Sequence, residues 1–410
     1  MSAEQVVEHV TCLGCGCACD DIAPVVRQNR IVEARNACPL GRAWFGDGTV
    51  PQETRVGKGS VSLDAALTQA ATILTQARRP LVYLAADLSC ETQRAAVGIA
   101  DRLRAVLDSS TSEIASGVLA AQRRGRAGAT LGELRRRADL VVFWGVDPAE
   151  RYPRYASRYA LAPGGPEGRT VVAVDVGGRR GPGDADARVI ISADVEVDAL
   201  GVMRAIARGR ALPDVPTLRP AVELARRMMH AQYVALVYDA EPDGTPTDPD
   251  RAEGLIALAQ ALNGPTRCAL STLRAGGNRS GADAVVTWQT GFPCAVDFGR
   301  GYPSYRPHDG AAALVARREI DATLVIGSPR SVPEPVARGL ASVLTVAIGP
   351  YASAATFEPA VAVDTGVAGI HEGGMAFRMD DVPLPLRPSI AGPPAAAVVV
   401  RDLATRLVST

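Results

Sequence analysis

The sequence predicts an α/β protein in which a small N-terminal Cys-rich β unit is followed by doubly wound lobes with parallel sheets. Five of the eight cysteines come before residue 39. From about residue 60, short runs rich in Val, Leu and Ile alternate with amphipathic segments, the pattern of strands buried between helical layers. A loop dense in Pro and Asp at 240–250 interrupts this alternation. We therefore expect three consecutive domains: a Cys-rich domain at 1–55, a first α/β lobe at 56–240, and a second α/β lobe with a C-terminal loop and short helix at 241–410.

Local patterns predict most of the elements. Residues 21–34 favour a two-stranded hairpin that turns at Gln28-Asn29-Arg30. Residues 62–77 predict an amphipathic helix with Ser62 as its N-cap, followed by a buried strand at 81–86. The continuing alternation predicts helices at 91–107, 195–209, 216–230, 251–262, 309–317 and 333–340, and strands at 138–145, 170–176, 266–271, 323–328 and 342–349.

Composition excludes several classes of function. The 410 residues carry a formal net charge of zero, whereas general binding to nucleic acid or to a membrane surface requires a basic excess. Neither a signal peptide nor an apolar stretch long enough to span a bilayer is visible, so we expect a cytoplasmic protein. Cysteines in that compartment are thiols or metal ligands rather than disulfides.

The N-terminal cysteines have metal-ligand spacing. Cys12, Cys15, Cys19 and Cys38 form a C-x2-C-x3-C-x18-C pattern, which can converge on one 4Fe–4S cluster. Zinc also accepts four thiolates, although its structural sites more often have two matched C-x2-C pairs. Vacant structural thiols are a third alternative, and Cys17 is a spare in each case.

Four segments resemble the family of formylmethanofuran dehydrogenase B subunits, within the molybdopterin oxidoreductase superfamily. The resemblance lies in 11–41 (TCLGCGCACDDIAPVVRQNRIVEARNACPLG), in 130–155, in 273–305, which contains WQTGFP and VDFGRGYP, and in 369–387. It implies lobes of the molybdopterin oxidoreductase type, and a family fold that carries a tungsten or molybdenum bis-pterin.

The chain differs from active members of this family at the residue that ligates the metal. The resemblance aligns Ala115 with the Cys or selenocysteine that ligates the metal in active members, and Ser116 with the adjacent His. A methyl group cannot coordinate tungsten or molybdenum, and no other cysteine lies between Cys90 and Cys268 to replace the ligand. We therefore expect no tungsten or molybdenum pterin and no catalytic residue in this chain. A pterin site that is lost removes the reason to keep a cluster, so the occupancy of the cysteine set stays open.

Several other residues are candidates with weaker signals. A glycine-rich segment has two interpretations; it contains Gly276, Gly277, Asn278 and Gly281. It is either a remnant of a pterin pocket, where glycines let the backbone approach phosphate, or a turn between a strand and a helix. The turn is the favoured interpretation. His371-Glu372 and Cys294 favour packing roles over chemistry. Arginines gather at three places, either as a solvated surface or as a face that binds a polyglutamate arm: Arg123, Arg124 and Arg126; Arg135, Arg136 and Arg137; and Arg151, Arg154 and Arg158.

The resemblance implies a non-catalytic, redox-inactive B subunit of a formyltransferase/hydrolase complex in one-carbon metabolism. Such a complex converts formyl-tetrahydromethanopterin to formate through a methanofuran-type carrier, with an amidohydrolase-like A subunit, a C subunit and a formyltransferase D subunit as partners. The B subunit would be a scaffold that also has the chemistry to hold a polyglutamylated carrier. The alternatives are an active tungsten or molybdenum formylmethanofuran dehydrogenase subunit and a cluster-bearing electron-transfer subunit.

Overall fold

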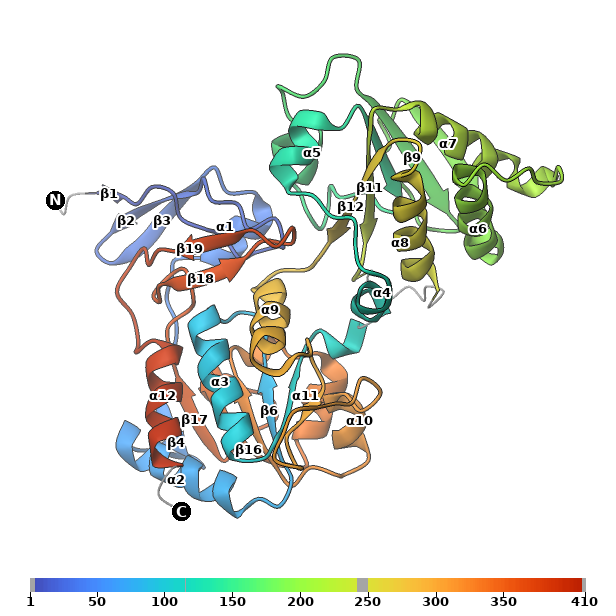
Figure 1. The fold of residues 1–410 in the computed structure, drawn as a ribbon. Coiled ribbons are helices and arrows are strands. Elements are labelled where there is room, and N and C mark those ends of the chain that lie inside the picture. The colour runs from blue at the N-terminus through green and yellow to red at the C-terminus, as the bar shows by residue number, and fades with distance from the viewer. Residues whose placement is uncertain (1–3, 115, 242–249, 408–410) are drawn as a thin grey trace. The chain divides into compact units, whose positions relative to one another are not determined.

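The structure is a computed structural model that describes residues 4–114, 116–241 and 250–407. The chain forms two compact units: unit 1 contains residues 1–113 and 276–410, and unit 2 contains residues 114–275 (Figure 1). This division differs from the three consecutive domains expected from the sequence. The reason is strand pairing, because β6 (Pro80–Leu84) pairs in parallel with β15 (Ala322–Ile326) and joins distant segments in one sheet.

The N-terminal part of unit 1 is an antiparallel sheet in the order β1-β2-β3 (Gln5–Val6, Ala23–Arg27 and Arg30–Arg35). The β2–β3 hairpin turns at Gln28 and Asn29, as the sequence predicts. Their φ angles of +49° and +56° suit a tight hairpin turn whose twist matches the flanking strands. Helix α1 (Pro39–Phe45) follows β3.

The larger sheet of unit 1 has the order β14-β13-β7-β6-β15-β16-β17-β4-β5. Its parallel centre, β7-β6-β15-β16-β17, is doubly wound, and antiparallel strands extend it at both ends. This arrangement confirms the expected α/β class. The remaining bounds are β4 Thr54–Val56, β5 Gly59–Ser60, β7 Val106–Ser109, β13 Val296–Asp297, β14 Ser304–Tyr305, β16 Leu344–Gly349 and β17 Val361–Asp364.

Helices cover both faces of this sheet, because successive side chains of its buried strands point to opposite faces. Val82 and Leu84 of β6 pack into one apolar cluster, whereas Leu81 and Tyr83 pack into the opposite one. The first cluster lies under α2, α3, α9 and α12, and the second under α10 and α11 (Figure 1). Their bounds are α2 Leu63–Gln76, α3 Cys90–Arg102, α9 Arg279–Thr290, α10 Ala311–Ala316, α11 Glu334–Leu340 and α12 Ala396–Arg406. A short hairpin, β18 (Gly374–Phe377) and β19 (Pro383–Leu386), completes the unit.

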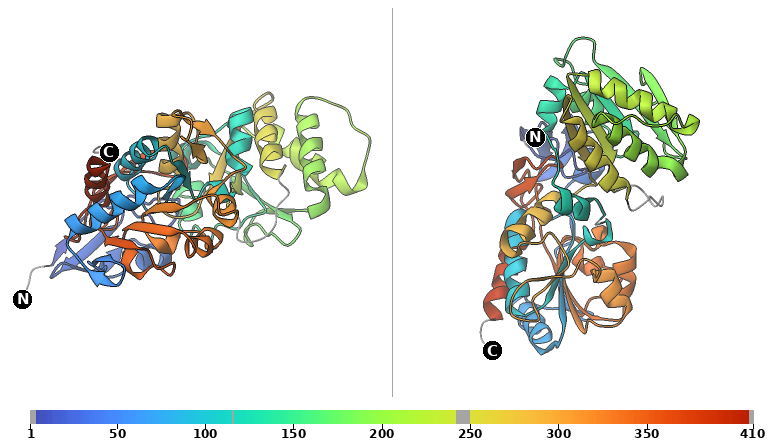
Figure 2. Two further views of the ribbon diagram at one scale, coloured as in Figure 1. Left: turned by 90° about the horizontal axis from the view of Figure 1, so that it is seen from below. Right: turned by 45° about the vertical axis from the view of Figure 1, so that its right-hand side comes forward.

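Unit 2 contains a parallel sheet in the order β10-β9-β8-β11-β12. In chain order these strands lie 3-2-1-4-5, so the winding reverses between β8 and β11, where ligands of doubly wound sheets bind outside the carboxyl ends. Helices α6, α7 and α8 pack on one face (Figure 2). The bounds are α4 Ser116–Arg124, α5 Leu131–Arg137, β8 Leu140–Trp144, β9 Thr170–Val176, β10 Ala187–Ile191, α6 Glu196–Ala207, α7 Arg219–His230, β11 Tyr233–Asp239, α8 Arg251–Leu262 and β12 Arg267–Leu273.

Most local predictions agree with these elements, although β11 was not predicted and one predicted helix is shorter than expected. The Ser62 hydroxyl caps α2 by accepting a hydrogen bond from the amide of Ala65 at 3.2 Å, as expected. The helix predicted over 91–107 ends at Arg102, and Val106 already belongs to β7. Arg104 causes this break, because its φ of +50° is incompatible with a right-handed helix. Within the described residues, no helix combines the length and apolar character needed to cross a bilayer.

Candidate cysteine site and the carboxyl edges of the two sheets

The segment between β1 and β2 forms a buried loop that carries Cys12, Cys15 and Cys19. The amide of Cys12 donates to the carbonyl oxygen of Cys19 at 2.9 Å, which closes the loop. Cys38 approaches from the start of α1, where its sulfur accepts a hydrogen bond from the amide of Gly41 at 3.4 Å. A tight loop and a helix N-cap thus supply the four cysteines that the sequence selects as ligands.

Two of these sulfurs meet over a glycine. A Cβ atom at Gly41 would lie 3.3 Å from Cys12 Sγ and 3.9 Å from Cys38 Sγ. The same added atom would lie 3.2 Å from the Cβ of Ala37, so a larger side chain would have to displace its neighbours. Gly41 therefore keeps a compact space into which two sulfurs point.

The environment of the loop disfavours isolated thiolates. Burial raises the pKa of Cys12, nearby Cys15, Cys19 and Cys38 raise it further, and the amide of Gly14 opposes them. A hydrogen bond to Cys15, together with burial, raises the pKa of Cys17. Positive charge from a bound metal would offset this penalty, because metal binding drives deprotonation of its thiol ligands.

Within the described part of the chain, no group of three His, Cys, Asp or Glu side chains is placed so that it could hold one metal ion. All eight cysteines, including the buried Cys294, are thiols rather than disulfides here.

The glycine-rich segment before α9 packs closely against the cysteine loop and the end of β6. A Cβ atom at Gly276 would lie 2.7 Å from the carbonyl oxygen of Gly14, and one at Gly277 would lie 2.4 Å from that of Ala86. Gly281 faces Asn278, with only 2.1 Å between an added Cβ and Asn278 Oδ1. Close backbone packing thus accounts for these glycines.

Two amides of this segment already have acceptors within the protein. Gly277 N donates to the carbonyl oxygen of Leu13 at 2.8 Å, and Asn278 N donates to that of Ala86 at 2.5 Å. These two amides are consequently engaged and do not offer hydrogen bonds to a phosphate. The geometry supports the turn interpretation of the segment.

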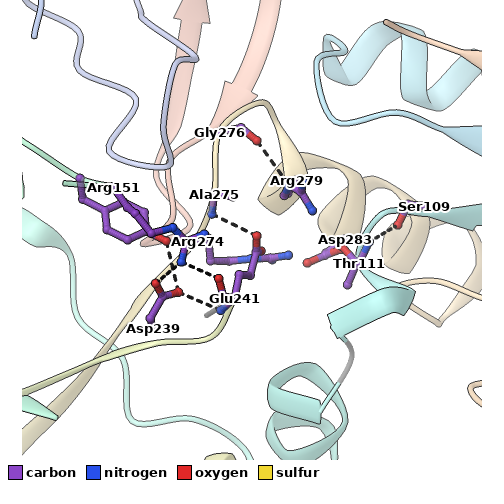
Figure 3. A network of polar contacts seen from close by, with 11 residues as sticks. Ser109, Thr111, Arg151, Asp239, Glu241, Arg274, Ala275, Gly276, Arg279 and Asp283 are labelled. Atoms are coloured by element: carbon purple, nitrogen blue, oxygen red, sulfur yellow. Dashed lines mark hydrogen bonds and ion pairs between the residues drawn. The ribbon is translucent and has the colours of Figure 1, made fainter. Parts of the chain in front are cut away.

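In unit 2, an ion-pair network lies at the carboxyl end of β11, beside the point where the strand order reverses (Figure 3). Arg151 pairs with Asp239 and also donates to the carbonyl oxygen of Glu241 at 2.6 Å. Tyr152 donates to Asp239 Oδ1 at 3.2 Å. The carboxylate of Glu241 accepts from Arg274 Nε at 2.9 Å and from the amide of Ala275 at 3.1 Å.

Burial dominates the electrostatics of this network. Burial raises the pKa of Asp239, and the Arg151 guanidinium counteracts it. A second buried pair lies at the end of β8, where Arg251 Nε donates to Glu196 Oε1 at 2.7 Å and Trp144 Nε1 donates to the same oxygen at 2.8 Å. Pairing within the chain thus satisfies the charges at this edge of the sheet. Of this network, the sequence analysis names Arg151 as a candidate binding residue but does not name Asp239, Glu241 or Arg274.

The His371-Glu372 pair has structural partners. His371 Nε2 lies 2.8 Å from the carbonyl oxygen of Gly48, and Nδ1 accepts from the amide of Val367 at 3.1 Å. Buried Glu372 accepts from the Ser89 hydroxyl at 2.7 Å and from the amide of Ala396, at the start of α12, at 2.8 Å. These bonds support the expected packing role.

The arginine groups are largely used within the chain. Arg123 and Arg124 both pair with Glu253, and Arg137 pairs with Glu133. Arg135 donates to the carbonyl oxygen of Pro163.

The sequence predicts that Ala115 replaces the metal-ligating cysteine of the family, and this residue lies outside the described residues. The elements on either side of it are a 3-10 turn at Ser112–Ile114 and α4.

The fold and the candidate site define the class of protein: it has two doubly wound α/β units, and the first carries a buried cysteine loop together with Cys38 at the start of α1. No family model matches the chain. The B subunit of tungsten-containing formylmethanofuran dehydrogenase 2 from Methanocaldococcus jannaschii is 32% identical over 97% of each chain, and that from Methanococcus maripaludis is 29% identical over 95% of each. The chain therefore belongs to the family of formylmethanofuran dehydrogenase B subunits.

Two further comparisons concern a bacterial complex. The B subunit of the formyltransferase/hydrolase complex from Methylorubrum extorquens is 32% identical over 78% of this chain and 86% of that protein. A chain in the crystal structure of the same complex with methylofuran matches with a TM-score of 0.72 and 27% identity, covering 87% of this chain and 98% of that one.

Proposed function

We propose that this chain is the redox-inactive B subunit of a cytoplasmic formyltransferase/hydrolase complex, in which it organises the catalytic subunits. The observation that carries the proposal is the lack of a metal-ligating cysteine: the family resemblance places Ala115 at the ligand position, and no cysteine lies between Cys90 and Cys268. Similarity to the B subunit of the Methylorubrum extorquens complex, in sequence and in fold, supports it.

Identity alone does not separate this function from the redox alternative. The tungsten-containing relatives match more of the chain than the bacterial B subunit does, at a similar level of identity. The distinction lies in chemistry, because the methyl group of alanine has no donor atom with which to coordinate tungsten or molybdenum. An alanine at the ligand position does not fit a metal-pterin site of the kind that active family members carry, and the proposed reaction does not pass through one.

The proposed complex does not require electron transfer. Formyl passes from tetrahydromethanopterin to a methanofuran-type carrier and is hydrolysed with water to formate, without oxidation or reduction. The formyltransferase D subunit and the amidohydrolase-like A subunit perform these steps, with the C subunit as a further partner. We assign the carrier to the complex as a whole rather than to the arginines of this chain, since Arg123, Arg124 and Arg151 have carboxylate partners.

We further propose that Cys12, Cys15, Cys19 and Cys38 retain a 4Fe–4S cluster with a structural role. Two observations support this assignment: the sulfurs of Cys12 and Cys38 both approach Gly41, and burial and the neighbouring cysteines raise the pKa of Cys12, so that its thiolate is unfavourable without a bound metal. The cluster would stabilise the loop on which the glycine-rich segment packs.

Metal analysis of the purified native complex tests both proposals. We expect no tungsten or molybdenum and close to four irons per B chain. Stoichiometric tungsten or molybdenum would overturn the redox-inactive role. An iron-free complex would instead refute only the cluster and leave vacant thiols. Deletion of the chain should prevent assembly of the remaining subunits, and normal assembly and turnover without it would disprove the scaffold role.

A further inference from the structure

A groove of about 700 Å³ lies on unit 2 between α6, α7 and the loop that joins them. The loop runs over 208–218 (Figure 2), and most of its residues are exposed. Aliphatic side chains from both helices and from the loop form the groove surface: Val202, Ile206, Leu212, Val215, Leu218 and Val222.

Four of these six side chains, those of Val202, Leu212, Val215 and Val222, do not pack against the core of unit 2. Ile206 and Leu218 pack in part against that core, whereas Leu200 and Met203 of α6 are buried in it. On the loop, Leu212 is 39% exposed and Val215 is 42% exposed. A contiguous aliphatic surface that extends from two helices onto a loop is typical of a binding surface rather than of scattered exposed residues.

The rim of the groove adds a charge preference. The charged side chains that line the groove are Arg210, Arg219, Arg226, Asp214 and Glu223, three positive and two negative, which leaves a net charge of +1. Arg219 Nε donates a hydrogen bond to Asp214 Oδ1 at 2.7 Å. Within the described residues, the structure shows no ion pair or hydrogen bond for the side chains of Arg210 and Arg226, which also line the groove. A partner with an apolar surface flanked by carboxylates would complement both the aliphatic groove and these two arginines.

We propose that this groove binds an amphipathic helix of another subunit, apolar on one face and flanked by Asp or Glu. Helices that lie in grooves present anchors at i, i+3, i+4 and i+7. On α6, Val202 and Ile206 line the groove and lie about one helical turn apart, so a short amphipathic helix with anchors at this spacing would match them. Two copies docked groove to groove would bring the same arginines together, which disfavours self-association through this face.

The proposal rests on the proposed function in one respect, because the occupant comes from another subunit of the complex. The test uses the full-length chain titrated against the remaining assembled subunits. Leu212→Asp places a charge on an exposed residue of the groove and should weaken binding roughly tenfold or more, the size expected when an interface anchor is lost. Ile190→Asp is the matched control, since Ile190 lies on β10 of the same unit, is 65% exposed and is not among the groove residues.

The rim has its own test. Arg226→Glu should weaken binding and reduce its dependence on salt, whereas Arg226→Lys should keep most of both because the positive charge remains. Unchanged affinity and salt dependence in Arg226→Glu would contradict the acidic character of the occupant.

A photo-crosslinker in place of Leu212 identifies the occupant. A crosslink to a partner segment with helically spaced apolar residues and flanking acids supports the proposal, whereas a crosslink to a second copy of this chain, or none, overturns it. If the wild-type chain does not bind the other subunits at all, the proposed function fails and the docking proposal fails with it. If the wild-type chain binds and Leu212→Asp binds equally well, or no worse than Ile190→Asp, only the docking proposal fails.

Discussion

Asn278 Oδ1 accepts a hydrogen bond from the backbone amide of Phe377 at 2.8 Å, and the same side-chain amide donates to the carbonyl oxygen of Leu88 at 2.9 Å. Asn278 is fully buried. One side chain therefore joins the start of α9 to β18 and to the segment before α3, three parts of unit 1 that are distant in sequence.

Replacement of Asn278 should destabilise unit 1. Asn278→Ala leaves the Phe377 amide and the Leu88 carbonyl without this partner in a buried place, which costs about 2–4 kcal/mol in the free energy of unfolding. Denaturant unfolding of the full chain measures the change. Gln260→Ala is the control, because it removes a solvent-exposed hydrogen bond to a backbone carbonyl. Equal effects of the two substitutions would show that Asn278 does not stabilise the unit in this way.

His371 should make the chain sensitive to acid. Burial lowers the pKa of His371 from its ordinary value of 6.5, although the hydrogen bond with Gly48 acts in the opposite direction. Protonation would also place a hydrogen on Nδ1, which accepts from the amide of Val367. The unfolded chain thus binds the proton more readily. The stabilising contribution is complete above about pH 6.5 and is lost as the pH falls toward the folded-state pKa.

The measurement is the free energy of unfolding between pH 7 and pH 5. His371→Asn should reduce the dependence on pH over this interval, while His308→Gln, which removes an exposed histidine, should keep the wild-type dependence. A dependence that is unchanged in His371→Asn would assign the acid sensitivity to other groups.

The pair formed by Arg151 and Asp239 should show strong coupling. Arg151→Met leaves the buried carboxylate of Asp239 without its cation, and we expect a loss of roughly 2–4 kcal/mol in the free energy of unfolding. The same loss should deepen as the pH rises, because burial already raises the pKa of Asp239 and removal of Arg151 raises it further. Adding Asp239→Asn to Arg151→Met should recover part of the stability, as a double-mutant cycle would measure. Strict additivity would mean that the two side chains contribute independently.

Much of the α/β organisation can be predicted from local patterns. The Ser62 cap, the hairpin at Gln28 and Asn29 and the strand at β15 all follow from short-range features: a capping hydroxyl, a turn that tolerates positive φ, and a buried aliphatic run. The pairing of β6 with β15 has no local signal, since about 240 residues separate the two strands. Local patterns therefore predict consecutive domains where the structure has a discontinuous unit.

The candidate site, too, can be predicted from the sequence only in part. The cysteine set is visible in the sequence because ligand spacing is itself a sequence property. The network around Asp239 was missed because β11 was not predicted; once that strand is recognised, an acidic residue at its carboxyl end is a clear signal. The sequence groups Arg151 with its neighbours Arg154 and Arg158, whereas its carboxylate partner, Asp239, lies at the distant end of β11.

Iron content should depend on four of the five N-terminal cysteines. Cys38→Ser removes the sulfur at the N-cap of α1, and we expect loss of iron together with lower stability of the cysteine loop. Cys17→Ser is the matched control: Cys17 is buried in the same loop, yet it is outside the C-x2-C-x3-C-x18-C set, so it should retain iron. Iron per chain and the visible absorption of a cluster in the purified complex give the readout. Loss of iron in Cys17→Ser with retention in Cys38→Ser would assign the ligands differently, and iron-free wild-type protein would show that the thiols are vacant.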